Sequence, residues 1–323
     1  NNLFHPHLDP PPSRGRKLKE PLIGGPFPPC GGRSGWGAYK ENTSFILRGA
    51  RLCGHGLLIR GEPLDYSLLL RHLDSIDEKR GNMDHVILVN IAGLSFFHLQ
   101  QLQHLPNFSR IIDQGMAVPL SPSFPAVTCP VQATLASGFC PADHGIISNG
   151  LYSHESYTVS FWEQPSSLVG KPRIWDLITE SSTNLTTALL FWQNILYANA
   201  DIVITPRPIH LEAGMIPWCY SKPVGYYEEL VKKLGEFNLM NYWGPLSSIK
   251  SSQWIMGASL ITLEKLKPNL LMIYLPQLDY SCQKYGPRSA AVQSDLRDLD
   301  SLLGSLLTTI DKLDIASKLT AIN

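Results

Sequence analysis

Runs of consecutive apolar residues recur along the chain from residue 85 onward. The first, HVILVNIAGL, spans residues 85–94, and further runs follow at 187–192, 201–205 and 269–275. Unbroken apolar runs of this length are typical of strands buried on both faces of a parallel sheet, whereas strands with one solvated face alternate apolar and polar residues. Each run therefore predicts one strand of a largely parallel sheet.

Helical patterns lie between these runs. The segments YYEELVKKLGEF (226–237) and VQSDLRDLDSLLGSLLTTIDKL (292–313) carry apolar residues at three- and four-residue spacing, which is the period of one helix face. The alternation of strands and helices predicts an α/β sandwich around a mainly parallel sheet. No internal repeat and no sharp second domain boundary interrupts residues 85–323.

The first 84 residues have a different character. Residues 1 to about 45 are rich in proline, glycine and charge, a composition that cannot bury enough apolar surface to order itself. One helical pattern follows at 64–81. We therefore expect 1–84 to be a poorly ordered or unrelated segment with one possible helix, and 85–323 to form the domain. In an alternative interpretation, Met83 is the natural start and the preceding residues are a foreign leader.

The charge balance narrows the range of partners. Lys plus Arg and Asp plus Glu each number 27, so the formal net charge is +0 at pH 7. Bulk electrostatic binding to duplex nucleic acid or to acidic membranes is therefore not expected, and any bound anion must be held by local groups. No apolar run approaches the ~20 residues that span a bilayer, and no signal-peptide core opens the chain. These features favour a cytoplasmic location.

The six cysteines lie far apart, without the paired spacing of a zinc module. We expect them to be mostly reduced thiols.

Three polar residues are placed where reactive groups gather in such folds, at the carboxyl ends of strands. Asn90 follows the first apolar run, Thr128 precedes a helical pattern, and Asp279 follows the last run. The sequence therefore predicts that these three side chains meet.

Thr128 has two interpretations. It can be the N-cap of the helix VQATLASG, with Gly138 as the C-terminal stop, because threonine side chains cap helices and glycine ends them. It can also be a nucleophile, because the N-terminus of a helix favours the negative charge of a phosphate. A hydroxyl needs a base or a metal ion to become reactive.

Five segments in a fixed order favour the second interpretation. They are VNIAGL, FPAVTCPVQATLASGFCPADHGIISNGLY, TPRPIHLEAGMIPWCY, YWGP and YLPQLDYSCQKYGP. Together they resemble the type I phosphodiesterase/nucleotide pyrophosphatase branch of the alkaline phosphatase superfamily, from about residue 85 to the end of the chain. The resemblance implies an alkaline phosphatase-like three-layer fold and a two-metal hydrolase, usually with zinc, in which a threonine attacks phosphorus.

The resemblance also implies the site residues. Thr128 would be the nucleophile and Asp279 a ligand of the second metal, with Gln283 standing where related nucleotide pyrophosphatases carry a histidine ligand. Asn90 stands where the family has an aspartate ligand of the first metal. Two divalent ions are implied, zinc first and manganese or magnesium second. The alternatives are that Asn90 is a turn residue, that Asp279 caps a helix or starts a turn, and that Gln283 is an exposed or hydrogen-bonding side chain.

Substrate contacts follow from the same comparison. Val131 stands where nucleotide-cleaving members carry an asparagine, and Gln132 is the next amide along the helix. Asn149 and Tyr152, in SNGLY, are candidates to line the pocket, although an Asn-Gly pair is also a turn signal. The expected ligand is a small phosphorylated molecule such as a nucleotide, and the sequence leaves the oligomeric state open.

Further ligands of the family follow the next strand, and KLTAIN (318–323) matches only the beginning of that strand. The chain is thus expected to be a divergent member that is incomplete at its C-terminal end. Asp143 and His144 belong to a structural turn in the family, and His98, His104 and His154 are expected to be surface or packing residues, as is His210. The leading hypothesis is a metal-dependent hydrolase of phosphodiester or pyrophosphate bonds, and the alternative is a non-catalytic binding or interaction module.

Overall fold

A computed structural model describes residues 85–322 of the 323-residue chain, except 116, 182–183, 213 and 316. The expectations for residues 1–84, including the helix at 64–81, lie outside the described residues. Every described residue belongs to one compact unit.

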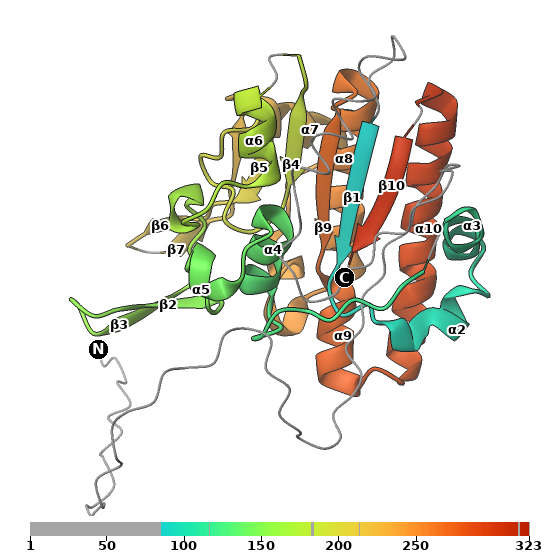
Figure 1. Ribbon diagram of the computed structural model, residues 1–323, viewed down its shortest axis with the longest axis horizontal. Coiled ribbons are helices and arrows are strands. Elements are labelled where there is room, and N and C mark those ends of the chain that lie inside the picture. Colours follow the sequence, from blue (N-terminus) through green and yellow to red (C-terminus); the bar gives the residue numbers. More distant parts are fainter. Residues whose placement is uncertain (1–84, 116, 182–183, 213, 316, 323) are drawn as a thin grey trace, which may run out of the picture. The chain divides into compact units, whose positions relative to one another are not determined.

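A six-stranded sheet organises the described residues (Figure 1). Its strands lie in the order β10-β1-β9-β4-β5-β8, and all neighbours are parallel except β5 and β8 at one edge. The bounds are β1 His85–Ile91, β4 Thr187–Leu190, β5 Ile202–Pro206, β8 Cys219–Lys222, β9 Leu270–Leu275 and β10 Ser317–Ile322.

The larger helices cover both faces of the sheet. Helix α8 contacts β9 and β4, and α10 packs on α8, α9 and α3. Because crossovers between parallel strands are right-handed, the connection from β1 to β4 runs in the opposite sense and carries α4 and α6 over the other face (Figure 1). The bounds are α3 Pro106–Gln114, α4 Thr128–Ser137, α6 Ile174–Ser181, α7 Tyr226–Leu234, α8 Ile249–Leu266, α9 Gln277–Tyr285 and α10 Ala290–Leu313.

Short elements complete the described part. Two hairpins lie outside the six-stranded sheet, and several short helices lie in the connections. The hairpins are β2 Gly150–Ser153 with β3 Thr158–Phe161, and β6 Ile209–Leu211 with β7 Gly214–Ile216. The short helices are η1 Phe96–His98, α2 Leu99–Leu102, α5 Pro141–His144, η2 Ser166–Leu168, η3 Leu239–Asn241 and η4 Gly244–Leu246.

The apolar runs predicted the strands correctly. β1, β4, β5 and β9 all fall within or beside the predicted ranges, and the two helical patterns form α7 and α10. The strand expected to begin at residue 318 is β10, which pairs with β1 along its whole length. The predicted α/β sandwich with a mainly parallel sheet is thus confirmed.

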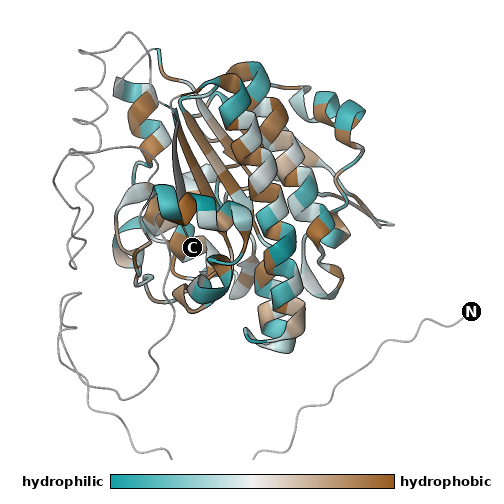
Figure 2. Cartoon of the chain, turned by 90° about the vertical axis from the view of Figure 1, so that its right-hand side faces the viewer, coloured by the Kyte–Doolittle hydropathy of each residue, from teal (hydrophilic) through white to brown (hydrophobic). Residues whose placement is uncertain are grey.

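Burial explains why the runs were unbroken. All residues of β4, β5 and β9 are buried, so neither face of these strands needs polar side chains. Hydrophobic residues predominate in the central strands, whereas the helices carry hydrophilic residues on their outer surfaces (Figure 2). None of the described helices combines the length and apolar character needed to cross a bilayer.

Candidate active site

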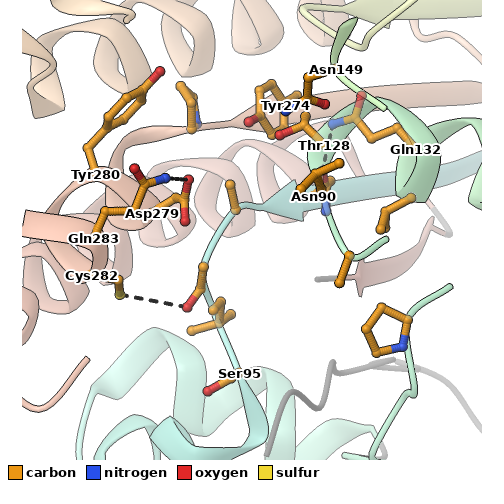
Figure 3. Close-up of a pocket in the computed structure, with 18 of the residues that line it drawn as sticks. Asn90, Ser95, Thr128, Gln132, Asn149, Tyr274, Asp279, Tyr280, Cys282 and Gln283 are labelled. Carbon is orange, nitrogen blue, oxygen red and sulfur yellow. Dashed lines mark hydrogen bonds between the residues drawn. The ribbon is translucent and has the colours of Figure 1, made fainter. Parts of the chain in front are cut away.

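A cavity of about 640 Å³ opens at the carboxyl ends of the parallel strands (Figure 3). Its lining includes Asn90 from β1, Thr128 from α4 and Asp279 from α9. The three side chains that the sequence placed at strand ends therefore line one cavity, as predicted. In open α/β sheets this is the edge at which ligands bind.

Thr128 is the first residue of α4 and not its N-cap. The N-cap is Val127, which makes no side-chain capping bond, while Gly138 ends the helix in the left-handed conformation with a φ of 74°. The capping interpretation of Thr128 was thus wrong, and the interpretation of Gly138 as the C-terminal stop is confirmed. The Thr128 side chain instead lies beside Tyr274 of β9 in the cavity lining (Figure 3). Burial raises the pKa of Tyr274 well above its ordinary value, so the phenol stays protonated beside Thr128.

Most main-chain N–H groups in the first turn of α4 are either hydrogen-bonded within the protein or missing. The Cys129 N–H donates to Asn149 Oδ1 at 2.9 Å, Pro130 has no N–H, and the Val131 N–H donates to the carbonyl of Val127 at 3.1 Å. Within the described residues, this leaves the N–H of Thr128 without a partner. A phosphoryl oxygen at this helix would therefore meet one main-chain donor next to the threonine hydroxyl.

Asn149 does more than form the turn that its Asn-Gly pair suggests. Its side-chain oxygen faces the Cys129 N–H at 2.9 Å, and a main-chain N–H can only donate. Because Oδ1 is engaged by this bond, Nδ2 is the part of the Asn149 amide that remains to donate to a ligand. Asn149 lines the cavity beside Thr128 (Figure 3).

Asn90 lies inside strand β1 and is 5% exposed, so its interpretation as a turn residue was wrong. Its Oδ1 accepts a hydrogen bond from Gln132 Nε2 at 2.7 Å. Gln132 is 1% exposed, and its Oε1 accepts the main-chain N–H of Gln193 at 2.7 Å. Both ends of the Gln132 amide, expected to contact substrate, therefore bind the protein itself.

Asp279 occupies the first turn of α9 and is half-buried. Burial raises the pKa of its carboxyl group, and the hydrogen bond from Gln283 opposes this shift. That bond runs from Gln283 Nε2 to Asp279 Oδ2 at 2.6 Å, which confirms the interpretation of Gln283 as a hydrogen-bonding side chain. Pro276 is the N-cap of α9, so Asp279 does not cap this helix.

The donor atoms at this edge fit a zinc pair poorly. The described residues contain no group of three or more His, Cys, Asp and Glu side chains that could hold a metal ion. The positions expected to bind metal offer one carboxylate, from Asp279, and the neutral amides of Asn90 and Gln283, both already hydrogen-bonded. Zinc prefers imidazole, thiolate and carboxylate ligands. These residues therefore form no zinc cage of their own.

The remaining predicted positions fall into two groups. Val131 lines the cavity, whereas Tyr152 lies on the hairpin strand β2, is 51% exposed and does not line it. The Asp-His pair belongs to the short helix α5, where His144 is fully buried and its Nδ1 accepts the Ile146 N–H at 3.1 Å. This supports the structural role expected for that turn.

The expectations for isolated histidines and cysteines hold where the structure describes them. His98 is fully buried, and its Nδ1 accepts the Ser95 N–H at 3.1 Å. The described cysteines are free thiols: Cys129, Cys140, Cys219 and Cys282.

Two lining residues were missed by sequence reasoning. Tyr274 stands opposite Asn90 in the β1–β9 register, and this pairing of strand ends could have indicated it. Arg288 lies between α9 and α10, with its guanidinium carbon 4.8 Å from the centre of the Phe97 ring. No local pattern in the sequence marks Arg288.

Comparison with known proteins agrees with this geometry. The family model described as type I phosphodiesterase / nucleotide pyrophosphatase matches residues 86–322. The chain is 25% identical over 242 residues to ectonucleotide pyrophosphatase/phosphodiesterase family member 3 of Bos taurus, covering 72% of this chain and 23% of the relative. It is 23% identical over 236 residues to an uncharacterised pyrophosphatase/phosphodiesterase of Schizosaccharomyces pombe, covering 71% of this chain and 41% of the relative. The chain thus spans less than half the length of these relatives.

The fold has a solved counterpart in phosphonoacetate hydrolase from Sinorhizobium meliloti, with a TM-score of 0.52 and 17% sequence identity, covering 70% of this chain and 54% of that one. This likeness shows the alkaline phosphatase-like fold. Because the family model matches almost the whole described part of the chain, the protein belongs to the type I phosphodiesterase/nucleotide pyrophosphatase family.

Proposed function

We propose that this chain forms the nucleophile-bearing part of a phosphoric ester hydrolase that cleaves phosphodiester or pyrophosphate bonds. The observation that carries the proposal is the position of Thr128, whose side chain lines the cavity beside the Asn149 amide. The main-chain N–H of Thr128 has no hydrogen-bond partner among the described residues. Membership of the family supports the same reaction class.

The proposed reaction has two displacements. Thr128 Oγ attacks phosphorus, the bond to the leaving-group oxygen breaks, and the hydroxyl proton is transferred to a base. Water then attacks phosphorus in the threonine-bound ester, the bond to Thr128 Oγ breaks, and the phosphate monoester leaves while the hydroxyl is restored. In this proposal the Thr128 N–H and Asn149 Nδ2 donate to the phosphoryl oxygens, whose charge grows in the transition state.

Asp279 is the proposed proton acceptor. It is the one acidic side chain among the described residues of the cavity lining. Its raised pKa lies closer to neutral pH than that of an exposed aspartate, which makes the carboxylate a stronger base. We assign Tyr274 to orienting the threonine hydroxyl and not to accepting its proton, because burial raises the pKa of the Tyr274 phenol and keeps it protonated at neutral pH.

The cavity also bears on the substrate class. Its volume of about 640 Å³ is in the range of roughly 300–1,000 Å³ that small-molecule sites have. Arg288 is the one cationic side chain in the described lining, so it is the group available to attract an anion. We therefore assign a nucleotide-sized phosphorylated substrate. The two divalent ions that the family resemblance implies would find a single carboxylate here, and no step is assigned to them.

Hydrolysis of a chromogenic phosphodiester tests the proposal. We expect slow release of the chromophore by the wild-type protein, loss of at least a hundredfold in Thr128→Ala, and partial retention in Thr128→Ser, which keeps a hydroxyl. Thr134→Ala, on the same helix, is the control and should keep the wild-type rate. Equal rates for Thr128→Ala and the wild type would exclude Thr128 as the nucleophile, and a folded protein without turnover would favour the binding-module alternative.

A further inference from the structure

A chain of directed hydrogen bonds joins three segments at the edge of the sheet. It runs from the main-chain N–H of Gln193, just beyond β4, to Gln132 on α4, and from Gln132 to Asn90 in β1. Both bonds are 2.7 Å long, and the three residues are 8%, 1% and 5% exposed in that order. The bonds are thus sheltered from water, where breaking them leaves buried groups unpaired.

The direction of both bonds is fixed by the first one. A main-chain N–H can only donate, so the atom of Gln132 that faces Gln193 must be the oxygen. The amide nitrogen of Gln132 then faces Asn90, and the atom of Asn90 that receives it must be an oxygen. The single atom of Asn90 that could bind a cation is therefore already engaged as a hydrogen-bond acceptor.

Gln132 stands four residues after Thr128, and residues four apart lie on the same face of a helix, one turn from each other. The hydrogen bond from Gln132 to Asn90 therefore fixes the distance between the first turn of α4, which carries Thr128, and the end of β1.

We infer that a buried amide bridge between Gln132 and Asn90 holds the nucleophile helix in place in this protein, in the position where the family resemblance implies a metal ion. Gln132 is thus a positioning residue and Asn90 is its anchor. Two neutral amides form the bridge without burying a charge, whereas a cation beside Asn90 would meet no negative charge from that side chain. The effect on catalysis rests on the proposed function, but the bridge itself does not.

Unfolding measurements test the bridge without any need for activity. The apolar variants Gln132→Met and Asn90→Leu keep side-chain volume and remove one partner each. We expect each to lower the folding equilibrium constant on the order of tenfold or more, since a buried group loses its partner. The double variant should lose little beyond the larger single loss, because both remove the same bond. Ser137→Ala, which removes a buried hydroxyl bonded within α4 itself, is the control and should not couple to Asn90.

Zinc titration provides the opposing outcome, using the wild-type protein so that it does not depend on a variant that folds. We expect neither zinc nor a chelator to change the denaturation midpoint of the wild-type protein. A zinc-dependent rise of that midpoint would overturn the inference, as would strictly additive losses in the double variant.

A kinetic measurement separates positioning from structure alone. If Thr128 is the nucleophile, Gln132→Met should lower kcat while KM stays within about twofold, because the substrate still binds but the hydroxyl is misplaced. A rise in KM with unchanged kcat would contradict the positioning role. The absence of any turnover in the wild type would refute the proposed function and leave the coupling and zinc results as the test of the bridge.

Discussion

Replacing Gly93 with alanine should damage the site through a single added methyl group. Gly93 follows β1 and has a φ of 79°, a conformation that alanine adopts only with strain. A Cβ atom at this position would stand 2.8 Å from the Asp279 Cα and 3.0 Å from its main-chain nitrogen, where ordinary contacts begin at 3.4 Å. The start of α9 must therefore move by about 3.4 − 2.8 = 0.6 Å.

The expected loss has two parts. The left-handed conformation costs an alanine about 1–2 kcal/mol, and an overlap with main-chain atoms adds about 1–3 kcal/mol, as overpacking does elsewhere. Since 1 kcal/mol shifts the melting temperature by about 2–4 °C in a domain of this size, we expect a fall of several degrees. A displacement near 1 Å can cost about a hundredfold in rate, so kcat/KM should drop at least tenfold.

Gly286 provides a matched control at the other end of the same helix. Its φ of 83° also strains an alanine, but a Cβ there meets nothing within 4 Å. Gly286→Ala should therefore lose only the conformational part of the stability and keep its activity. Thermal unfolding and chromogenic phosphodiester hydrolysis measure both effects. Equal losses in the two variants would refute the reasoning, because the contact with Asp279 would then have no measurable effect.

Three further changes have defined outcomes. Asp279→Asn should abolish most activity. At pH values above the raised pKa of the Asp279 carboxyl group it should also increase the free energy of unfolding, because burial disfavours the charged form that the variant lacks. This gain should vanish at acid pH, and a gain in denaturation midpoint that does not depend on pH would contradict the prediction. Asp300→Ala should cost about 3 kcal/mol in the free energy of unfolding, since the Asp300 carboxylate accepts the main-chain N–H and the side-chain Nδ2 of Asn107 at 2.9 Å each. Urea titration measures the loss, and a loss below about 1 kcal/mol would argue against a stabilising role of these two hydrogen bonds. Arg288→Ala should raise KM for a substrate with a second anionic group and not for a singly charged phosphodiester, with Lys284→Ala as control; equal KM changes for both substrates would exclude the anion role.

The sequence predicted the parts of the molecule that depend on local patterns. Buried parallel strands need unbroken apolar runs, so β1, β4, β5 and β9 were evident, and the rule for strand ends brought Thr128 to the same cavity as Asp279. It did not predict which side chains would be engaged with each other. The bond to the Gln193 N–H depends on a main-chain group 61 residues from Gln132, which no residue pattern reveals.

The helix entrance illustrates the same limit. A threonine before a Cys-Pro step fits an N-cap. In the structure, however, the N-cap is Val127, α4 begins at Thr128, and the Cys129 N–H donates to the Asn149 side chain. Arg288 was missed because its position depends on how the α9–α10 connection packs against Phe97.

Trapping the covalent intermediate is the direct test of Thr128 as the nucleophile. Wild-type protein would be mixed with a chromogenic phosphodiester, quenched in acid within one turnover, digested and analysed by mass spectrometry. We predict a phosphoester adduct on Thr128 that retains one ester group of the substrate, is absent from Thr128→Ala and disappears on longer incubation. Product formation with an unmodified Thr128 peptide, or with the phosphoryl group on another residue, would contradict it.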